Sequence, residues 1–364
     1  MLDTIICIGA GKDQLPIIEA IKKAGFRVLA IDQNKNAPGL NLCDFYIQES
    51  THDFTKLKPH LEKLLVECNF LSILNRSSGY PVITTAEISN FLGFDNLPVT
   101  SARNIVFKDK CRKQSKRLGV KVPFFDIKNN INDIKDYKEL NGKIIKSCIT
   151  DIGKSGIFVI NENQHINKIL KEAFKLSLNN RILIEDYIEG IDLQLIGFVA
   201  SGKLTVFSII EELNVFNSKG KLNGRGMKTF DIENNQAIVS EIIKQCQMII
   251  NGFKITMSPF MASFRVKNLD AYLIEIHLDI GGDLLLEHLM PATLGVNYAD
   301  LLVEFSMKKV KEISSSFLSP AAIVFENSQE LISNRKYQVI EADSFSNLEI
   351  KVSNLLGSMW QTQK

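Results

Sequence analysis

The sequence predicts an α/β protein whose first part is a doubly wound parallel unit and whose second part is an α+β unit. Near the N-terminus, apolar runs of strand length alternate with stretches of helical periodicity. Beyond about residue 120, strand-length runs follow one another with few helices between them, which is typical of an antiparallel sheet. The chain has 364 residues, enough for two or three packed domains of about 100 to 200 residues each.

The first part begins with a β-α-β pattern. Residues 4–8 are apolar and β-rich, helical periodicity covers 15–24, and a second apolar run covers 27–31. The alternation continues with a helix, a strand and a helix over 54–68, 70–74 and 82–92. We therefore predict one doubly wound N-terminal domain over residues 1–100.

The glycine turn after the first strand raises the question of a dinucleotide site. Gly9-Ala10-Gly11 begins a G-x-G-x-x-G pattern, but Gln14 stands where the third glycine belongs. Asp32 ends the second strand, where an acid can bind a ribose. Without the third glycine, a tight strand-to-helix turn explains the glycines better, so a dinucleotide-dependent oxidoreductase stays an alternative only.

The second part starts after a basic helical stretch over 101–119, which ends before Val122-Pro123 because proline cannot continue a helix. Strands are predicted over 143–146, 157–160, 181–186, 193–200, 203–211, 257–266 and 271–277. Helices are predicted over 164–177 and over 235–251. A long helical region is predicted to follow the strand 271–277 and to end at about residue 314. The polar, glycine-containing stretch 217–231 is expected to be a mobile loop.

These elements suggest how the remainder of the chain is divided. We predict a second domain over 101–318, with a lid over about 120–190. A small C-terminal segment over 319–364 would follow, with strands over 321–325 and 337–341.

Composition and charge exclude several functions. Apolar residues make up 45% of the chain, and 43 Lys and Arg oppose 41 Asp and Glu, for a net charge of +2. That charge is too small for a protein that depends on nucleic acid or an anionic membrane. The start of the chain lacks the basic residues of a signal peptide, and no apolar run approaches the ~18 residues of a membrane span. The six cysteines are isolated, which favours a reduced compartment. We expect a cytoplasmic protein with small-molecule partners, without nucleic-acid or membrane partners, and compatible with a homodimer.

Two patterns in the second part carry chemistry. Lys146 ends a strand and precedes a polar loop with Gly153 and Ser155, an arrangement that can clamp phosphates. A surface lysine beside a hairpin is the plainer alternative. Strand periodicity places Glu275 and His277 on one face, where a carboxylate and an imidazole can share a metal ion. A polar solvent-exposed face is again the plainer alternative.

The order of these features over about residues 3–310 resembles the ATP-grasp superfamily of carboxylate-amine ligases. The resemblance implies a nucleotide site made of Lys108, Lys146, Gly153, Ser155, Glu185, Asp186, Tyr187, Ile188 and Asp192. In this site the two lysines would bind the ATP phosphates and the glycine-serine loop would act as a flexible lid. The four-residue stretch that begins at Glu185 would recognise adenine, and Asp192 would hold the ribose.

The sequence departs from this family pattern at the metal centre. The family coordinates magnesium with two carboxylates on adjacent strands and an Asn, followed by an Arg that faces the substrate. Glu275 fills the second carboxylate position and Ser263 stands in the first, while His277 replaces the Asn and Asp279 replaces the Arg. With ATP as cofactor, Glu275 and His277 are the candidates to hold Mg²⁺ or Mn²⁺.

Since Asp279 replaces the arginine of the family pattern, another residue must supply positive charge near the substrate. We take Arg225, Lys228 and Arg265 as candidate catalytic residues for this role. Otherwise Asp279 indicates a different substrate, because an acid holds an amine better than a carboxylate, or the catalytic centre has decayed. The resemblance therefore implies an ATP-dependent ligase that forms an amide through an acyl phosphate. A nucleotide-binding protein without turnover, acting as a scaffold or regulator, is the alternative that Ser263 and Asp279 favour.

Overall fold

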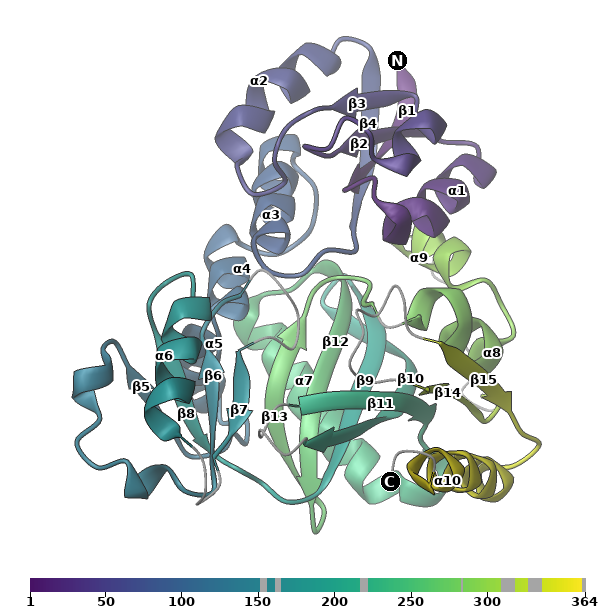
Figure 1. Ribbon diagram of the computed structural model, residues 1–364. Helices are drawn as coiled ribbons and strands as arrows, with labels where there is room; N and C mark the ends of the chain where they lie inside the picture. The colour runs from purple at the N-terminus through teal and green to yellow at the C-terminus, as the bar shows by residue number, and fades with distance from the viewer. Residues whose placement is uncertain are drawn as a thin grey trace.

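The computed structural model describes residues 1–150, 156–160, 165–216, 222–282, 284–308, 318–326 and 336–361. An N-terminal α/β unit lies against a larger β-rich body, and a small antiparallel lid stands beside that body (Figure 1). Among the described residues, no helix has both the length and the apolar character that crossing a bilayer requires.

The N-terminal unit is built on a parallel sheet in the order β3-β2-β1-β4. Its strands are β1 (Leu2–Ile8), β2 (Arg27–Ile31), β3 (Phe45–Ile47) and β4 (Cys68–Asn75). Its helices are α1 (Leu15–Lys23), α2 (Phe54–Leu64) and α3 (Tyr80–Leu92). Ile5 of β1 is in one core with residues of α1, while its neighbour Ile6 is in a second core with residues of α2 and α3. Helices thus cover both faces, and the prediction of a doubly wound unit is confirmed.

The glycine turn after β1 is held by Asp32. Its two carboxylate oxygens accept hydrogen bonds from the backbone N–H groups of Ala10 and Asn34, each at 2.8 Å. The Gln14 side chain packs against Gly9, whose φ is +87°. Asp32 therefore serves the turn itself, and the residues that suggested a dinucleotide site are used in local structure.

The basic stretch between the two parts forms two helices where the sequence predicts one. Helix α4 (Val99–Val106) ends at Phe107, whose backbone is extended, and α5 (Lys108–Arg117) begins immediately after it. The break has a structural cause, because the N–H of Lys108 donates to the carbonyl oxygen of Cys148 in the lid at 3.0 Å.

The lid is an antiparallel sheet in the order β5-β8-β6-β7. Its strands are β5 (Phe125–Lys128), β6 (Lys143–Ser147), β7 (Ile157–Val159) and β8 (Ile182–Asp186). Helix α6 (Ile166–Leu176) buries Leu170 and Ala173 in the same core as Ile145 and Ile184 of the sheet.

The large body is a seven-stranded antiparallel sheet in the order β13-β12-β9-β10-β11-β14-β15. Its strands are β9 (Ile191–Ala200), β10 (Lys203–Phe216), β11 (Leu222–Thr229), β12 (Met257–Lys267), β13 (Asp270–His277), β14 (Ala321–Phe325) and β15 (Tyr337–Glu341). The helices packed on it are α7 (Gln236–Phe253), α8 (Met290–Leu294), α9 (Tyr298–Ser306) and α10 (Phe345–Gln361), with a π-helical turn over Leu285–Leu289. The C-terminal strands therefore complete the central sheet.

The expectation of a mobile loop over 217–231 is wrong for the part that the structure describes. Strand β11 pairs with β10 on one side and with β14 on the other. A Cβ on Gly226 would lie 2.1 Å from the carbonyl oxygen of Ile323, so this glycine permits close strand approach. The same residue type that indicates a loop in sequence is here a packing requirement, and residues 217–221 lie outside the described ranges.

Candidate functional site

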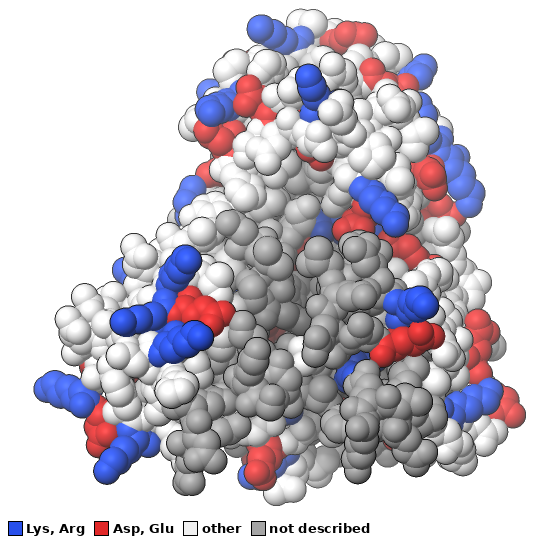
Figure 2. Space-filling model, viewed as in Figure 1, with Lys and Arg blue, Asp and Glu red and all other residues white. Residues whose placement is uncertain are grey.

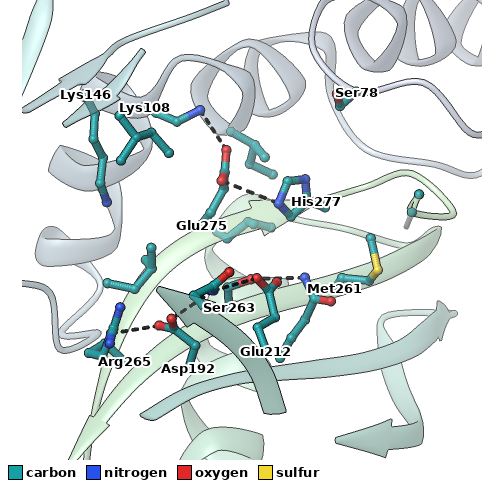
Figure 3. A pocket seen from close by; sticks show the side chains of 18 of the residues that line it. Ser78, Lys108, Lys146, Asp192, Glu212, Met261, Ser263, Arg265, Glu275 and His277 are labelled. Atoms are coloured by element: carbon teal, nitrogen blue, oxygen red, sulfur yellow. Dashed lines mark hydrogen bonds and ion pairs between the residues drawn. The ribbon is translucent and has the colours of Figure 1, made fainter. Parts of the chain in front are cut away.

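A cavity of about 530 Å³ opens where the lid, the central sheet and the N-terminal unit meet. Predicted site residues that line it are Lys108, Lys146, Glu185, Asp186, Tyr187, Ile188, Asp192, Arg265, Glu275 and His277. Figure 3 shows several of these side chains converging from β13, from the lid and from helix α5. The fold thus brings together residues that are up to 169 positions apart in the chain, as from Lys108 to His277.

Lys146 is held at the cavity wall by a buried carboxylate. Its Nζ lies 2.7 Å from Oε2 of Glu185, and Nε of Arg112 contacts the other oxygen of that carboxylate. Burial lowers the pKa of Lys146, an effect that Glu185 opposes. Burial would raise the pKa of Glu185, but Arg112 and Lys146 hold it below its usual value. The Glu185 side chain is therefore an ionised anchor for Lys146.

Lys108 reaches the same cavity from the start of α5. Its Nζ lies 2.7 Å from Oε1 of Glu275, and Oε2 of Glu275 lies 3.6 Å from Nε2 of His277 (Figure 3). Burial opposes ionisation of Glu275, yet Lys108 and His277 keep its pKa well below the usual value. Glu275 is thus an ionised carboxylate between two cationic groups.

His277 stands between two acids on the edge strand. Its Nδ1 lies 3.8 Å from Oδ2 of Asp279, whose Oδ1 accepts a hydrogen bond from the N–H of Gly281 at 2.9 Å. Burial lowers the pKa of His277, but Glu275 and Asp279 together raise it to about 9. The ring therefore bridges the two acids, and a metal ion bound by this ring would have to displace a proton from it, because a ligating imidazole must be neutral.

Ser263 lies directly opposite Glu275 in the β12–β13 register, which is the position that the family resemblance implies for the missing carboxylate. Its hydroxyl oxygen accepts a hydrogen bond from Nε2 of Gln194 at 3.0 Å. Among the described residues, no group of three His, Cys, Asp or Glu side chains could hold a metal by itself. Glu275 and the Ser263 hydroxyl fit a magnesium ion that is bound chiefly by nucleotide phosphates, since magnesium takes few protein carboxylates and keeps water ligands.

Asp192 is part of a polar cluster on the cavity floor. Oδ1 lies 2.7 Å from Nε of Arg265, and Oδ2 accepts a hydrogen bond from Nδ2 of Asn214 at 3.0 Å. The same Asn214 amide donates to Oε2 of Glu212 at 3.0 Å. Burial raises the pKa of Asp192 although Arg265 opposes the rise. This cluster offers several acceptors and one amide to hydroxyl groups.

Glu212 and Asn214 are site residues that the sequence analysis missed. They lie two positions apart on β10, on one face of the strand. The signal was available, because the alternation of residues 203–211 continues through Glu212-Leu213-Asn214. Because the predicted strand ended at residue 211, Glu212 and Asn214 were not assigned to its cavity face.

Arg265 joins the cavity floor to the hinge segment, which we define as residues 187–190 after β8. Besides Asp192, it contacts the carbonyl oxygen of Gly190 at 2.9 Å, and its guanidinium carbon lies 5.5 Å from the ring centroid of Tyr187. Both contacts are to the segment after β8. Arg265 therefore holds the hinge segment and the floor in register, and it does not supply a free charge to a substrate in this arrangement.

The other two basic candidates lie on β11, outside the cavity lining, although Gly224 and Met227 of the same strand do line it. Lys228 pairs with Glu211 at 3.2 Å and with Glu349 of α10. Arg225 is buried. A strand paired on both sides cannot swing these side chains over a substrate as a loop could, so the structure does not bring Arg225 and Lys228 to the site. Gly153 and Ser155 lie outside the described residues.

No protein-family model matches the chain, and no curated protein matches its sequence. Solved structures match its fold. Phosphoribosylglycinamide synthetase from Anaerococcus prevotii gives a TM-score of 0.72 at 15% identity, covering 98% of this chain and 98% of that one. L-amino acid ligase from Bacillus licheniformis gives 0.72 at 18% identity, covering 90% and 81%. N5-carboxyaminoimidazole synthetase from Staphylococcus aureus, complexed with ADP, gives 0.71 at 17% identity, covering 96% and 96%. The chain has the ATP-grasp fold that the sequence resemblance implied.

Proposed function

We propose that the protein is an ATP-dependent carboxylate-amine ligase that works through an acyl phosphate. The observation that carries this proposal is the convergence of Lys108, Lys146 and Glu275 on one cavity of a chain with the ATP-grasp fold. Two ammonium groups and one ionised carboxylate are the groups that a triphosphate and its magnesium require.

The cavity divides into parts that suit the parts of ATP. Ile144 of β6 and Ile157 of β7 line it from the lid, and apolar walls of this kind suit a purine ring. Asp192 and Glu212 on the floor would accept hydrogen bonds from ribose hydroxyls. Lys108 and Lys146 would then meet the phosphates, where two fixed positive charges offset the charge of the transferred group.

In the proposed reaction a substrate carboxylate oxygen attacks the γ-phosphorus of ATP and ADP leaves. The amine nitrogen then attacks the acyl carbon, inorganic phosphate leaves, and the nitrogen loses one proton. Lys108 would exchange its partner Glu275 for the phosphates, which frees Glu275 to help hold magnesium. Magnesium, when bound, would neutralise charge that develops on the phosphates. The chain itself positions the reactants and offsets charge.

A nucleotide-binding protein without turnover is the second candidate. Ser263 faces Glu275 where the family pattern has a carboxylate, and Glu275 is already neutralised by Lys108.

One experiment separates the two functions. The protein is incubated with ATP, magnesium and pooled carboxylic acids and amines, while ADP release and ATP-dependent thermal stabilisation are followed. A ligase shows both, whereas a binder shows stabilisation with no release above background; no stabilisation at millimolar ATP would remove both candidates.

The metal centre supports a separate prediction. Ser263→Glu should tighten magnesium binding in the ATP complex, because each additional anionic oxygen strengthens a site for a hard cation. Glu275→Gln should weaken magnesium binding and abolish turnover. Calorimetric titration of magnesium into the protein with saturating ATP measures both effects. Ser263→Gln is the matched control, since it adds the same bulk without charge; equal affinities for all of these variants would show that β12 and β13 hold no metal.

A further inference from the structure

Part of the cavity lining next to the N-terminal unit is apolar. Met227 of β11, Met261 of β12 and Leu285 line it and belong to one buried cluster. Gly281 is seated against two of them, because a Cβ there would lie 2.9 Å from Cε of Met261 and 3.1 Å from Cδ1 of Leu285. Thioether and leucine side chains in a cavity lining suit an apolar group.

The arginine in this part of the lining is fully engaged. The Arg76 side chain is 3% exposed and makes a two-point ion pair with Glu287, with N–O distances of 2.5 and 2.8 Å. Its Nε donates to the carbonyl oxygen of Gly281 at 2.9 Å, and Nη1 also contacts that of Asp13. A guanidinium with these partners has little capacity left for a substrate anion.

The cations in the rest of the described cavity lining are also paired within the protein. Among the described residues that line the cavity, every lysine and arginine contacts a carboxylate: Lys108 pairs with Glu275, Lys146 with Glu185, Arg265 with Asp192 and Arg76 with Glu287. Lys108 and Lys146 would bind the ATP phosphates in the proposed function. Beside the apolar part of the lining, Asp279 stands where the family pattern has an arginine. A second anionic group on a substrate would therefore meet an acid and lack a cation.

We propose that the carboxylate substrate is a monocarboxylic acid with an apolar side chain and no second anionic group, and that Met227, Met261 and Leu285 receive this side chain. Apolar α-amino acids are the simplest compounds of this class. Dicarboxylic and phosphorylated acids are disfavoured by the absence of a free cation among the described lining residues. The inference rests on the proposed ligase function and adds the substrate class.

The test uses hydroxylamine in place of the unknown amine. The carboxylate oxygen displaces ADP from the γ-phosphorus, hydroxylamine nitrogen displaces phosphate from the acyl carbon with loss of a proton, and a hydroxamate accumulates. L-leucine, L-methionine, L-glutamate and O-phospho-L-serine are compared with ATP and magnesium. We expect at least tenfold more hydroxamate per enzyme from the two apolar amino acids. The same order is expected in the thermal stabilisation that each acid adds to the ATP-bound protein.

A variant at Gly282 tests the charge argument without disturbing the packing. Gly282 lines the cavity, and a Cβ there would meet nothing within 4 Å. Gly282→Lys should shift the ratio of glutamate to leucine hydroxamate by at least tenfold towards glutamate, whereas Gly282→Met, of similar length and uncharged, should not. An unchanged ratio in Gly282→Lys would overturn the proposal.

The outcomes separate this inference from the proposed function. Preference for glutamate or phosphoserine in the wild-type protein overturns the substrate class while leaving the ligase function standing. Stabilisation by ATP with no hydroxamate from any acid overturns both the ligase function and the inference. Preference for the apolar acids, reversed or reduced in Gly282→Lys, supports both.

Discussion

Replacing Lys146 by Met is expected to remove half or more of the thermal stabilisation that ATP gives the protein. A ligand present at 100 times its dissociation constant stabilises the native state by about 2.7 kcal/mol. A hydrogen bond to a charged group contributes about 1.5 to 3 kcal/mol, so loss of the ammonium should weaken ATP binding about 10- to 150-fold. The measurement is the ATP-induced shift in unfolding temperature, compared with each variant's own ATP-free value.

That comparison matters because Lys146 also has a structural partner. Lys146→Met leaves the buried carboxylate of Glu185 with Arg112 alone, so the ATP-free variant should itself unfold at lower temperature. Lys121→Met is the matched control, since Lys121 pairs with Asp270 on the surface and does not line the cavity. If Lys146→Met keeps the wild-type response to ATP, the phosphates do not bind at Lys146 and the proposed site is wrong.

Arg112→Met is expected to lower the free energy of unfolding by about 3 to 5 kcal/mol, the usual cost of breaking a buried ion pair by removing one partner. The Arg112 side chain is 3% exposed. It contacts Glu185, the carbonyl oxygen of Leu273 and, at 2.9 Å, that of Ile274. Loss of the guanidinium leaves the carbonyl groups of Leu273 and Ile274 without this donor, and leaves a buried carboxylate with only Lys146. Urea unfolding followed by circular dichroism measures the change.

A surface arginine provides the control. Arg103 of α4 pairs with Glu87 of α3 at 2.8 Å, but its side chain is 47% exposed. Arg103→Met should therefore cost less than about 1 kcal/mol. Equal decreases in the free energy of unfolding for the two variants would mean that Arg112 does not specially stabilise the contact between α5, the lid and the central sheet.

One face of the molecule shows how charge is distributed over the described residues. On the face that Figure 2 shows, the basic and acidic side chains of the described residues are interspersed. An extended field of one sign, which nucleic-acid binding requires, is not seen among the described residues on that face. The sequence-based expectation of small-molecule partners stays the basis for the proposals above.

Much of the fold could be predicted from the sequence because it depends on local pattern. Apolar runs predicted β1, β2 and both C-terminal strands, and the strands over 321–325 and 337–341 have the predicted bounds. The family resemblance also implied that Ser263 and Glu275 lie on adjacent strands at one site, and the register of β12 and β13 pairs them. Local periodicity is sufficient for such features, because they involve residues that are close in the chain.

Only the tertiary structure decided which charges meet and which residues reach the cavity. Arg76 and Glu287 are 211 positions apart, and no local pattern predicts that they form a two-point pair. Lys228 looked free in sequence, yet the pairing of β11 with β14 directs it to Glu349. The pairing of Lys108 with Glu275 likewise depends on where α5 packs against β13. The sequence determines which side chains carry charge, but the packing of whole elements determines which charges pair. A buried charge is tolerated only where another element of the fold supplies an opposite charge.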